Sequence, residues 1–268
     1  MLFLLSPAKN LNFDPAPGAA RVTKPKLIKE TLELSETTRK LSRADLKRLM
    51  GISDKLAELN YERFQAFEGK TSGLGTKSAA LAFNGEVYGG LDAVNLDAED
   101  LKFAQENLCI LSGLYGALRP LDAIEPYRLE MGTKLKNPRG TSLYDFWGDN
   151  VAKFINAGLK NHEDKTVINL ASNEYFSVVD KNTLKYPVIT PSFKEEKDGK
   201  SRMLMFYAKR ARGMMARWAI QNRITNAQDL KKFSVEGYKF NKAGSDEMNW
   251  LFSRPQPAPK KPAPKRKK

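Results

Sequence analysis

The sequence predicts a fold of the α+β (mixed α/β) class, built as a single domain over residues 1–253. Three short apolar runs typical of buried strands lie at 2–5, 108–111 and 167–170, and helical patterns separate them at irregular intervals. The chain has 268 residues, of which 41% are apolar, enough for one sizeable core or two modest ones. No internal repeat and no convincing linker occurs before residue 253, so we expect one domain.

The N-terminal segment is expected to be a buried strand followed by a loop. Leu2–Leu5 is apolar and is stopped by a Ser-Pro pair, so Ser6–Lys9 should leave the carboxyl end of the strand. Lys9 then stands where ligands often bind. Farther on, Pro25 is favourable as the first residue of a helix, and helical spacing is kept by Leu27, Thr31, Leu34, Thr38 and Leu41.

A helix, a tight turn and a second helix are expected over about 42–68. Ser42-Arg43-Ala44-Asp45 has the pattern of a capping box, which opens a helix. Gly51 breaks that helix, and Ser53 can cap the next one. The apolar residues that follow fall within one broad arc of the second helix.

The remaining elements follow from apolar periodicity and from turn residues. We expect a Gly, Ser and Thr loop at 70–78, a turn-rich segment at 79–91, helices at 98–107, 143–159 and 208–222, and strands near 186–193, 237–240 and 248–252.

The charge balance predicts a polyanionic partner. Lysine and arginine number 45 against 31 acids, which gives a net charge of +14, and basic chains of this kind usually meet phosphate or nucleic acid. Part of the excess lies in 254–268, a segment rich in proline and lysine that contains no acid. We expect this tail to be extended and disordered, because it has nothing to bury.

Several function classes are disfavoured by what the sequence lacks. Cys109 and His162 are the single cysteine and the single histidine, so we expect no disulfide, no zinc or other bound metal, and no Ser-His-Asp triad. Gly75-Thr76-Lys77-Ser78 breaks the P-loop pattern, so we expect no nucleotide cofactor there. No apolar run is long enough to cross a membrane or to direct secretion. We therefore expect a cytoplasmic protein without a cofactor and without an obligate protein partner.

The turn between the two helices resembles a helix-hairpin-helix. In that motif a Gly-hydrophobic-Gly turn lets backbone N–H groups at a helix N-terminus meet a DNA phosphate. Here Gly51-Ile52-Ser53 has serine in place of the second glycine. An ordinary helical corner is the alternative, and the pattern alone favours it over phosphate binding. Lys55 and other cations near the turn add support to phosphate binding.

The helix expected at 208–222 has one basic face and one apolar face. Lys209, Arg210, Arg212 and Arg217 lie in one half of the helical projection. A solvated charged face is the alternative. Such faces normally mix both signs, whereas 209–223 contains no acid, so phosphate contact is at least as well supported.

The segment 111–132 leaves a buried strand and presents charged side chains on a loop. If 126–131 is extended, Arg128 and Glu130 share one face, and Arg119 precedes them. Charged groups beside a strand end form a plausible site. A structural ion pair between Arg128 and Glu130 remains the alternative.

Taken together, these segments resemble the YaaA family of bacterial peroxide-stress proteins from Met1 to about Phe252. The stretches that carry the resemblance are Ser6-Pro7-Ala8-Lys9, Ile52-Ser53-Asp54-Lys55-Leu56-Ala57, 111–132, Leu143-Tyr144-Asp145-Phe146-Trp147-Gly148, Ile168-Asn169-Leu170-Ala171-Ser172 with Glu174-Tyr175, 206–217 and Gly237-Tyr238. The resemblance implies the cantaloupe fold with a helix-hairpin-helix-like element and a positive cleft. It also implies a protein that protects against hydrogen peroxide, limits free iron and oxidative DNA damage, and binds double-stranded DNA.

We therefore expect a DNA-binding stress protein whose phosphate contacts tolerate any sequence and weaken with salt. The residues expected to bind DNA are Gly51, Ile52, Ser53, Lys55, Lys209, Arg210, Arg212 and Arg217. The alternative is a DNA-processing enzyme of the glycosylase or lyase type, with Lys9, Arg119, Arg128 and Glu130 as candidate catalytic residues. Direct iron sequestration is disfavoured by the scarcity of histidine and cysteine.

Overall fold

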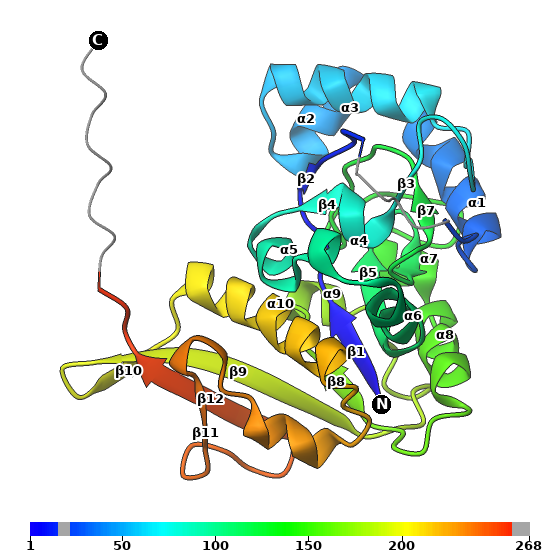
Figure 1. The fold of residues 1–268 in the computed structure, drawn as a ribbon. Coiled ribbons are helices and arrows are strands. Elements are labelled where there is room, and N and C mark those ends of the chain that lie inside the picture. Colours follow the sequence, from blue (N-terminus) through cyan, green and yellow to red (C-terminus); the bar gives the residue numbers. More distant parts are fainter. Residues whose placement is uncertain (16–21, 259–268) are drawn as a thin grey trace.

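A mostly parallel sheet forms the centre of the protein in the computed structural model, which describes residues 1–15 and 22–258 (Figure 1). Four parallel strands lie at its centre: β1 (Leu2–Leu5), β5 (Leu108–Ser112), β8 (Val167–Asn169) and β9 (Val188–Lys197). They lie in the order β9-β8-β1-β5. The three strands expected at 2–5, 108–111 and 167–170 are therefore confirmed, and the chain has the predicted mixed α/β class.

The sheet is extended at both sides by further strands. β6 (Gly116–Leu118) pairs antiparallel with β5 at one edge. At the other side β12 (Asn249–Pro255) pairs parallel with β9, β11 (Lys239–Asn241) pairs antiparallel with β12, and β10 (Lys200–Arg202) returns antiparallel along β9. Two small ladders join β2 (Asn10–Leu11) to β4 (Phe83–Asn84) and β3 (Lys77–Ser78) to β7 (Ala123–Ile124).

Helices cover both faces of the central strands, which is why those strands are buried throughout. α6, α8 and α10 each contact β1, and every residue of β1 and β5 is buried. The helices are α1 (Ile28–Arg39), α2 (Arg43–Met50), α3 (Asp54–Ala66), α4 (Ala79–Ala82), α5 (Glu86–Leu91), α6 (Ala98–Asn107), α7 (Leu143–Trp147), α8 (Asn150–Leu159), α9 (Asn173–Phe176) and α10 (Met205–Gln221), with 3-10 turns η1 (Ala93–Asn95), η2 (Ala227–Lys232) and η3 (Val235–Gly237).

One expected helix is divided. The segment 143–159 forms α7 and α8 rather than a continuous helix, because Gly148 takes a positive φ of 46° and ends α7 after Trp147. A left-handed backbone at the end of a helix favours glycine and turns the chain out of the helix. His162, just after α8, is half-buried: its Nδ1 lies 2.9 Å from the Met1 amino nitrogen, and burial lowers the pKa of the imidazole.

The C-terminal boundary also differs from expectation. β12 runs to Pro255, so the domain does not end at residue 253. Arg254, which we placed in the tail, is only 3% exposed and its Nη1 donates to Glu236 Oε2 over 2.9 Å. The expectation of a disordered tail was wrong for this arginine because its acidic partners come from other elements. Of that tail, residues 259–268 lie outside the described residues.

Candidate functional site

The strand order creates a crevice between the loops that follow β1 and β8. β1 has β5 on one side and β8 on the other, so the chain crosses from one side of β1 to the other between successive parallel strands. Loops that leave two neighbouring strands in opposite directions open a gap at their carboxyl ends, where ligands bind in open α/β sheets. Ser6–Lys9 and Ser172–Tyr175 are the segments at this edge.

A cavity of about 560 Å³ occupies this crevice. Its two strand loops are joined directly, because Ser172 N donates to Ser6 Oγ over 2.9 Å. The Tyr88 hydroxyl, which reaches in from α5, donates to the Ser6 carbonyl oxygen over 3.1 Å. These bonds fix the position of the loop that carries Lys9.

Three of the four candidate catalytic residues meet at this cavity. Lys9 Nζ lies 3.0 Å from Glu130 Oε1, and Arg128 Nη2 donates to the same oxygen over 3.0 Å. Both Lys9 and Glu130 line the cavity. The expected alternation over 126–131 is confirmed, since Tyr127, Leu129 and Met131 are buried on the opposite face. The structure therefore contains the expected ion pair, and it places the Glu130 member of that pair at a cavity.

Arg119 lies elsewhere. Its Nη2 donates to Oδ1 of the fully buried Asp122 over 2.9 Å, and it lines a separate cavity together with Cys109. This guanidinium holds the turn that follows β6. The structure thus brings Lys9, Arg128 and Glu130 together and leaves Arg119 apart.

The basic face of α10 is divided between two roles. Lys209 and Arg212 line the cavity beside Lys9. Arg210 Nε instead lies 3.3 Å from Glu236 Oε1, and Arg217 Nη1 donates to the Leu91 carbonyl oxygen over 3.1 Å at the end of α5. Two of the four expected cations therefore make structural contacts.

Arg212 is the cation that burial affects most strongly at the cavity. Desolvation lowers the pKa of its guanidinium, and no ion pair or hydrogen bond satisfies this group within the described part of the chain. A partly desolvated cation without a counterion is costly. An anion bound in the cavity would remove that cost.

Two glycines set the position of α10 against α5. Gly90 faces the backbone of Arg210 and Met214, and Gly213 faces the backbone of Val87 and Leu91. A Cβ at Gly213 would overlap the Val87 carbonyl oxygen and lie 2.7 Å from Leu91 N. This backbone-to-backbone approach is what brings Lys209 and Arg212 to the wall that Tyr88 forms.

The corner between α2 and α3 has the geometry expected from the sequence. Ser42 and Asp45 form a reciprocal capping box, and Ser53 Oγ accepts from Leu56 N at the start of α3. Gly51 adopts φ +60°, a left-handed conformation that favours glycine. Ile52 is buried beneath the turn. The helix, turn, helix arrangement is therefore confirmed.

Ion pairs occupy part of the charge at this corner. Lys47 Nζ lies 2.8 Å from Asp54 Oδ1, and Arg48 Nη2 lies 2.9 Å from Asp45 Oδ1. Lys55 is exposed and makes no ion pair with any described residue. Figure 1 shows α2 and α3 at the top of the molecule, well separated from α10. The two surfaces expected to bind DNA are thus distinct.

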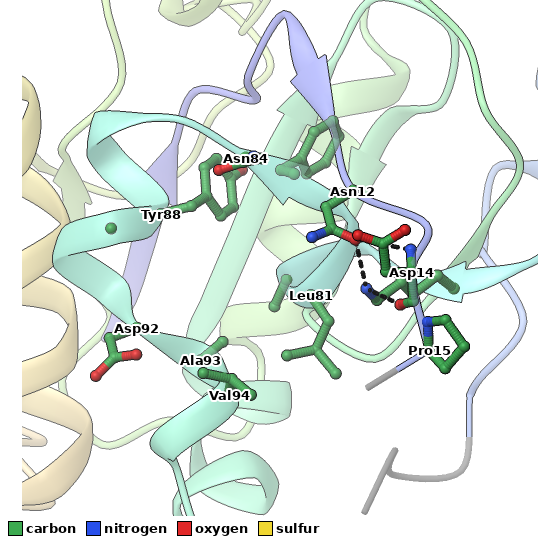
Figure 2. Close-up of a pocket in the computed structure, with 13 residues that line it drawn as sticks. Asn12, Asp14, Pro15, Leu81, Asn84, Tyr88, Asp92, Ala93 and Val94 are labelled. Carbon is green, nitrogen blue, oxygen red and sulfur yellow. Dashed lines mark hydrogen bonds between the residues drawn. The ribbon is translucent and has the colours of Figure 1, made fainter. Parts of the chain in front are cut away.

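A second cavity of about 300 Å³ adjoins the first and shares Asn84 and Tyr88 with it (Figure 2). On its far side Asn12 Oδ1 accepts from Asp14 N over 2.7 Å, and Lys77 Nζ donates to the Asp14 carbonyl oxygen over 2.8 Å. The lysine of the rejected P-loop pattern therefore holds a neighbouring loop.

Sequence reasoning missed several residues that line the main cavity. Glu86 and Tyr88 come from α5, Glu174 and Tyr175 follow β8, and Met205 begins α10. Glu174 and Tyr175 lie shortly after an apolar strand, a signal that was available. No sequence signal pointed to Glu86 and Tyr88, because their segment was expected to form turns.

Over residues 1–15 and 22–258, no group of three or more His, Cys, Asp or Glu side chains is placed to hold a metal ion. None of the helices described there is long and apolar enough to span a membrane.

Known proteins match this chain over nearly its whole length. Residues 1–244 match the family described as peroxide stress protein YaaA. A UPF0246 protein of Maricaulis maris (strain MCS10) is 59% identical over 258 residues, which cover 96% of this chain and 97% of the relative. A UPF0246 protein of Phenylobacterium zucineum (strain HLK1) is 53% identical over 269 residues, covering 100% of this chain and 99% of the relative.

Proposed function

The chain belongs to the peroxide stress protein YaaA family, and we propose that it acts in the peroxide stress response by binding double-stranded DNA in the cytoplasm. The observation that carries DNA binding is the meeting of Lys9 with Lys209 and Arg212 at one cavity. Cations from distant parts of the sequence that gather on one surface form an electrostatic site for phosphates. Limiting free iron and oxidative DNA damage is the proposed outcome.

The corner at Gly51 is proposed as a second phosphate contact of the helix-hairpin-helix type. The N–H groups of Gly51 and Ile52 are already bonded to the Lys47 carbonyl oxygen. The donors left for a phosphate are therefore the backbone N–H groups of Ser53, Asp54 and Lys55, since Leu56 N already donates to Ser53 Oγ, with the Lys55 side chain beside them. The Asp54 carboxylate lies at the same place, so we expect this contact to be weaker than that of the cavity.

The first prediction concerns salt-dependent DNA binding. A Lys209→Ala/Arg212→Gln variant should bind a random-sequence duplex about tenfold more weakly, and the slope of log Kd against log salt should fall by about two, since each lost phosphate contact removes close to one unit. Fluorescence anisotropy of a labelled duplex across a salt series measures both. A Lys55→Ala variant should lower the slope by about one or less.

The matched control is Lys160→Ala/Lys165→Ala, which removes two exposed charges near the amino ends of β1 and β8, at the opposite edge of the sheet. A chain ending at Ala258 tests the tail without cutting β12, which ends at Pro255. The proposed cavity site would be contradicted if the control pair lost as much duplex affinity as the cavity pair. It would also be contradicted if the truncation alone abolished binding.

A DNA-processing enzyme is the second candidate, favoured by the Lys9–Glu130 contact of 3.0 Å at the cavity. A carboxylate beside an amine, with Arg128 behind it, suits acid–base work on a bound nucleotide. The second prediction is that any base release or strand nicking should fall at least about a hundredfold in Glu130→Gln, a usual contribution of acid–base catalysis, while duplex affinity is retained. Gel analysis of end-labelled duplexes checks this. Equal products from the variant would exclude Glu130 as a catalytic residue.

A further inference from the structure

Two exposed apolar side chains begin α10, the helix that carries Lys209 and Arg212 to the cavity. Met205 and Phe206, the first two residues of α10, are 55% and 56% exposed. Met205 lines the cavity itself, and Phe206 is an i, i+3 neighbour of Lys209 on the helix surface. Exposed apolar side chains beside cations are what proteins use to stack on bases or to wedge between base steps.

The interior of the cavity fits a nucleobase better than it fits a phosphate alone. Tyr88 and Tyr175 contribute aromatic walls, and the volume of about 560 Å³ lies in the range of small-molecule sites. Carboxylates from Glu86 and Glu174 also line it. Carboxylates repel phosphate, but they accept hydrogen bonds from the exocyclic amino groups of bases.

The charges therefore match the two parts of a nucleotide. Lys209 and Arg212 are suited to the phosphate, while Glu86 and Glu174 are suited to the amino edge of the base. Glu130 is already offset by Lys9 and Arg128. No ion pair in residues 1–15 and 22–258 engages Glu86 or Glu174.

We propose that the cavity receives one nucleotide extruded from duplex DNA, and that Met205 and Phe206 fill the gap this leaves in the base stack. The inference rests on the proposed DNA binding and adds what the site holds. Extrusion costs unpairing and unstacking, and it costs least where a base is mismatched or unpaired. The protein should therefore prefer such duplexes, and it should prefer amino-bearing bases to thymine in the extruded position.

The third prediction tests extrusion directly. A duplex with 2-aminopurine opposite an abasic site, a duplex with thymine there, and a fully paired 2-aminopurine duplex are titrated with the full chain. We expect the 2-aminopurine fluorescence of the first duplex to rise several-fold on binding, and its Kd to be about tenfold below that of the paired duplex. Phe206→Ala should remove most of that preference, because base–aromatic stacking contributes about tenfold per base.

Leu74→Ala is the control, since Leu74 is 95% exposed on the loop before β3 and lies outside the cavity. It should leave the preference and the fluorescence unchanged. Binding to all duplexes with equal Kd and no fluorescence rise would overturn extrusion and leave DNA binding intact. Failure to bind any duplex would overturn both proposals. A full fluorescence rise in a Met205→Ala/Phe206→Ala chain would overturn the wedge.

Discussion

An Arg254→Met variant should lose about 3–5 kcal/mol of unfolding free energy, because it leaves a buried carboxylate without its cation. Glu195 is 1% exposed, and its Oε1 lies 3.6 Å from Arg254 Nε. Arg254 also donates to the Glu236 carbonyl oxygen over 3.1 Å and stacks on Tyr238 at 4.3 Å. Methionine keeps part of the packing and removes all of the charge.

The Tyr238 hydroxyl shows how closely this cluster is coupled. It donates to Glu195, and burial together with that carboxylate raises the pKa of the phenol. Leu204 N donates to Glu195 Oε2 over 3.3 Å just before α10 begins. The cluster therefore ties β12 and β9 to the start of the helix that carries the cavity cations, so its loss should loosen the site as well as the sheet.

Urea unfolding followed by circular dichroism measures this effect. Arg202→Met on β10 is the control, because Arg202 is exposed and makes no ion pair with a described residue; its loss should change stability by less than about 0.5 kcal/mol. Adding Glu195→Gln to Arg254→Met should recover part of the lost stability, since the unpaired charge is then gone. A double variant as unstable as the sum of the two single variants would argue against a charge-based explanation.

Much of the central sheet and several of the longer helices could be predicted from local patterns. The buried strands were apolar runs, and capping signals at Ser42 and Ser53 marked the corner. The apolar run before the Ser-Pro pair predicted that Lys9 follows the carboxyl end of a strand. Ser6–Lys9 does leave β1 at the edge of the sheet where the cavity lies. Hydrophobic periodicity and turn-forming residues are local properties of the chain, so a single sequence is enough to reveal them.

Long-range partners could not be predicted in the same way. Arg254 sits in a segment whose composition is that of a tail, and the groups that bury it belong to β9 and η3. The basic face of α10 was predicted as one surface, but the carbonyl oxygens at the end of α5 engage Arg217 and leave Lys209 and Arg212 at the cavity. Which cations are free is decided by what packs beside them.

The glycine at position 213 is another residue whose role no local pattern predicts. In isolation, Gly213→Ala should favour the helix by about 1 kcal/mol. In this fold the added Cβ would overlap the Val87 carbonyl oxygen, a backbone atom that cannot rotate away. We therefore expect a net loss of about 3 kcal/mol or more, because overpacking must displace α10 from α5.

Gly158→Ala is the matched control for this prediction. Gly158 also lies inside a helix, α8, but the nearest atom to its added Cβ is Leu2 Cδ2 at 3.8 Å, an ordinary contact. It should be neutral or stabilising by up to about 1 kcal/mol. Thermal and urea unfolding of the two variants give the comparison, and duplex binding gives a second readout. Since Lys209 and Arg212 reach the cavity through the Gly213 contact, DNA affinity should fall with Gly213→Ala under conditions where the chain remains folded. Equal stability of the two glycine variants would mean that α10 does not depend on this close approach.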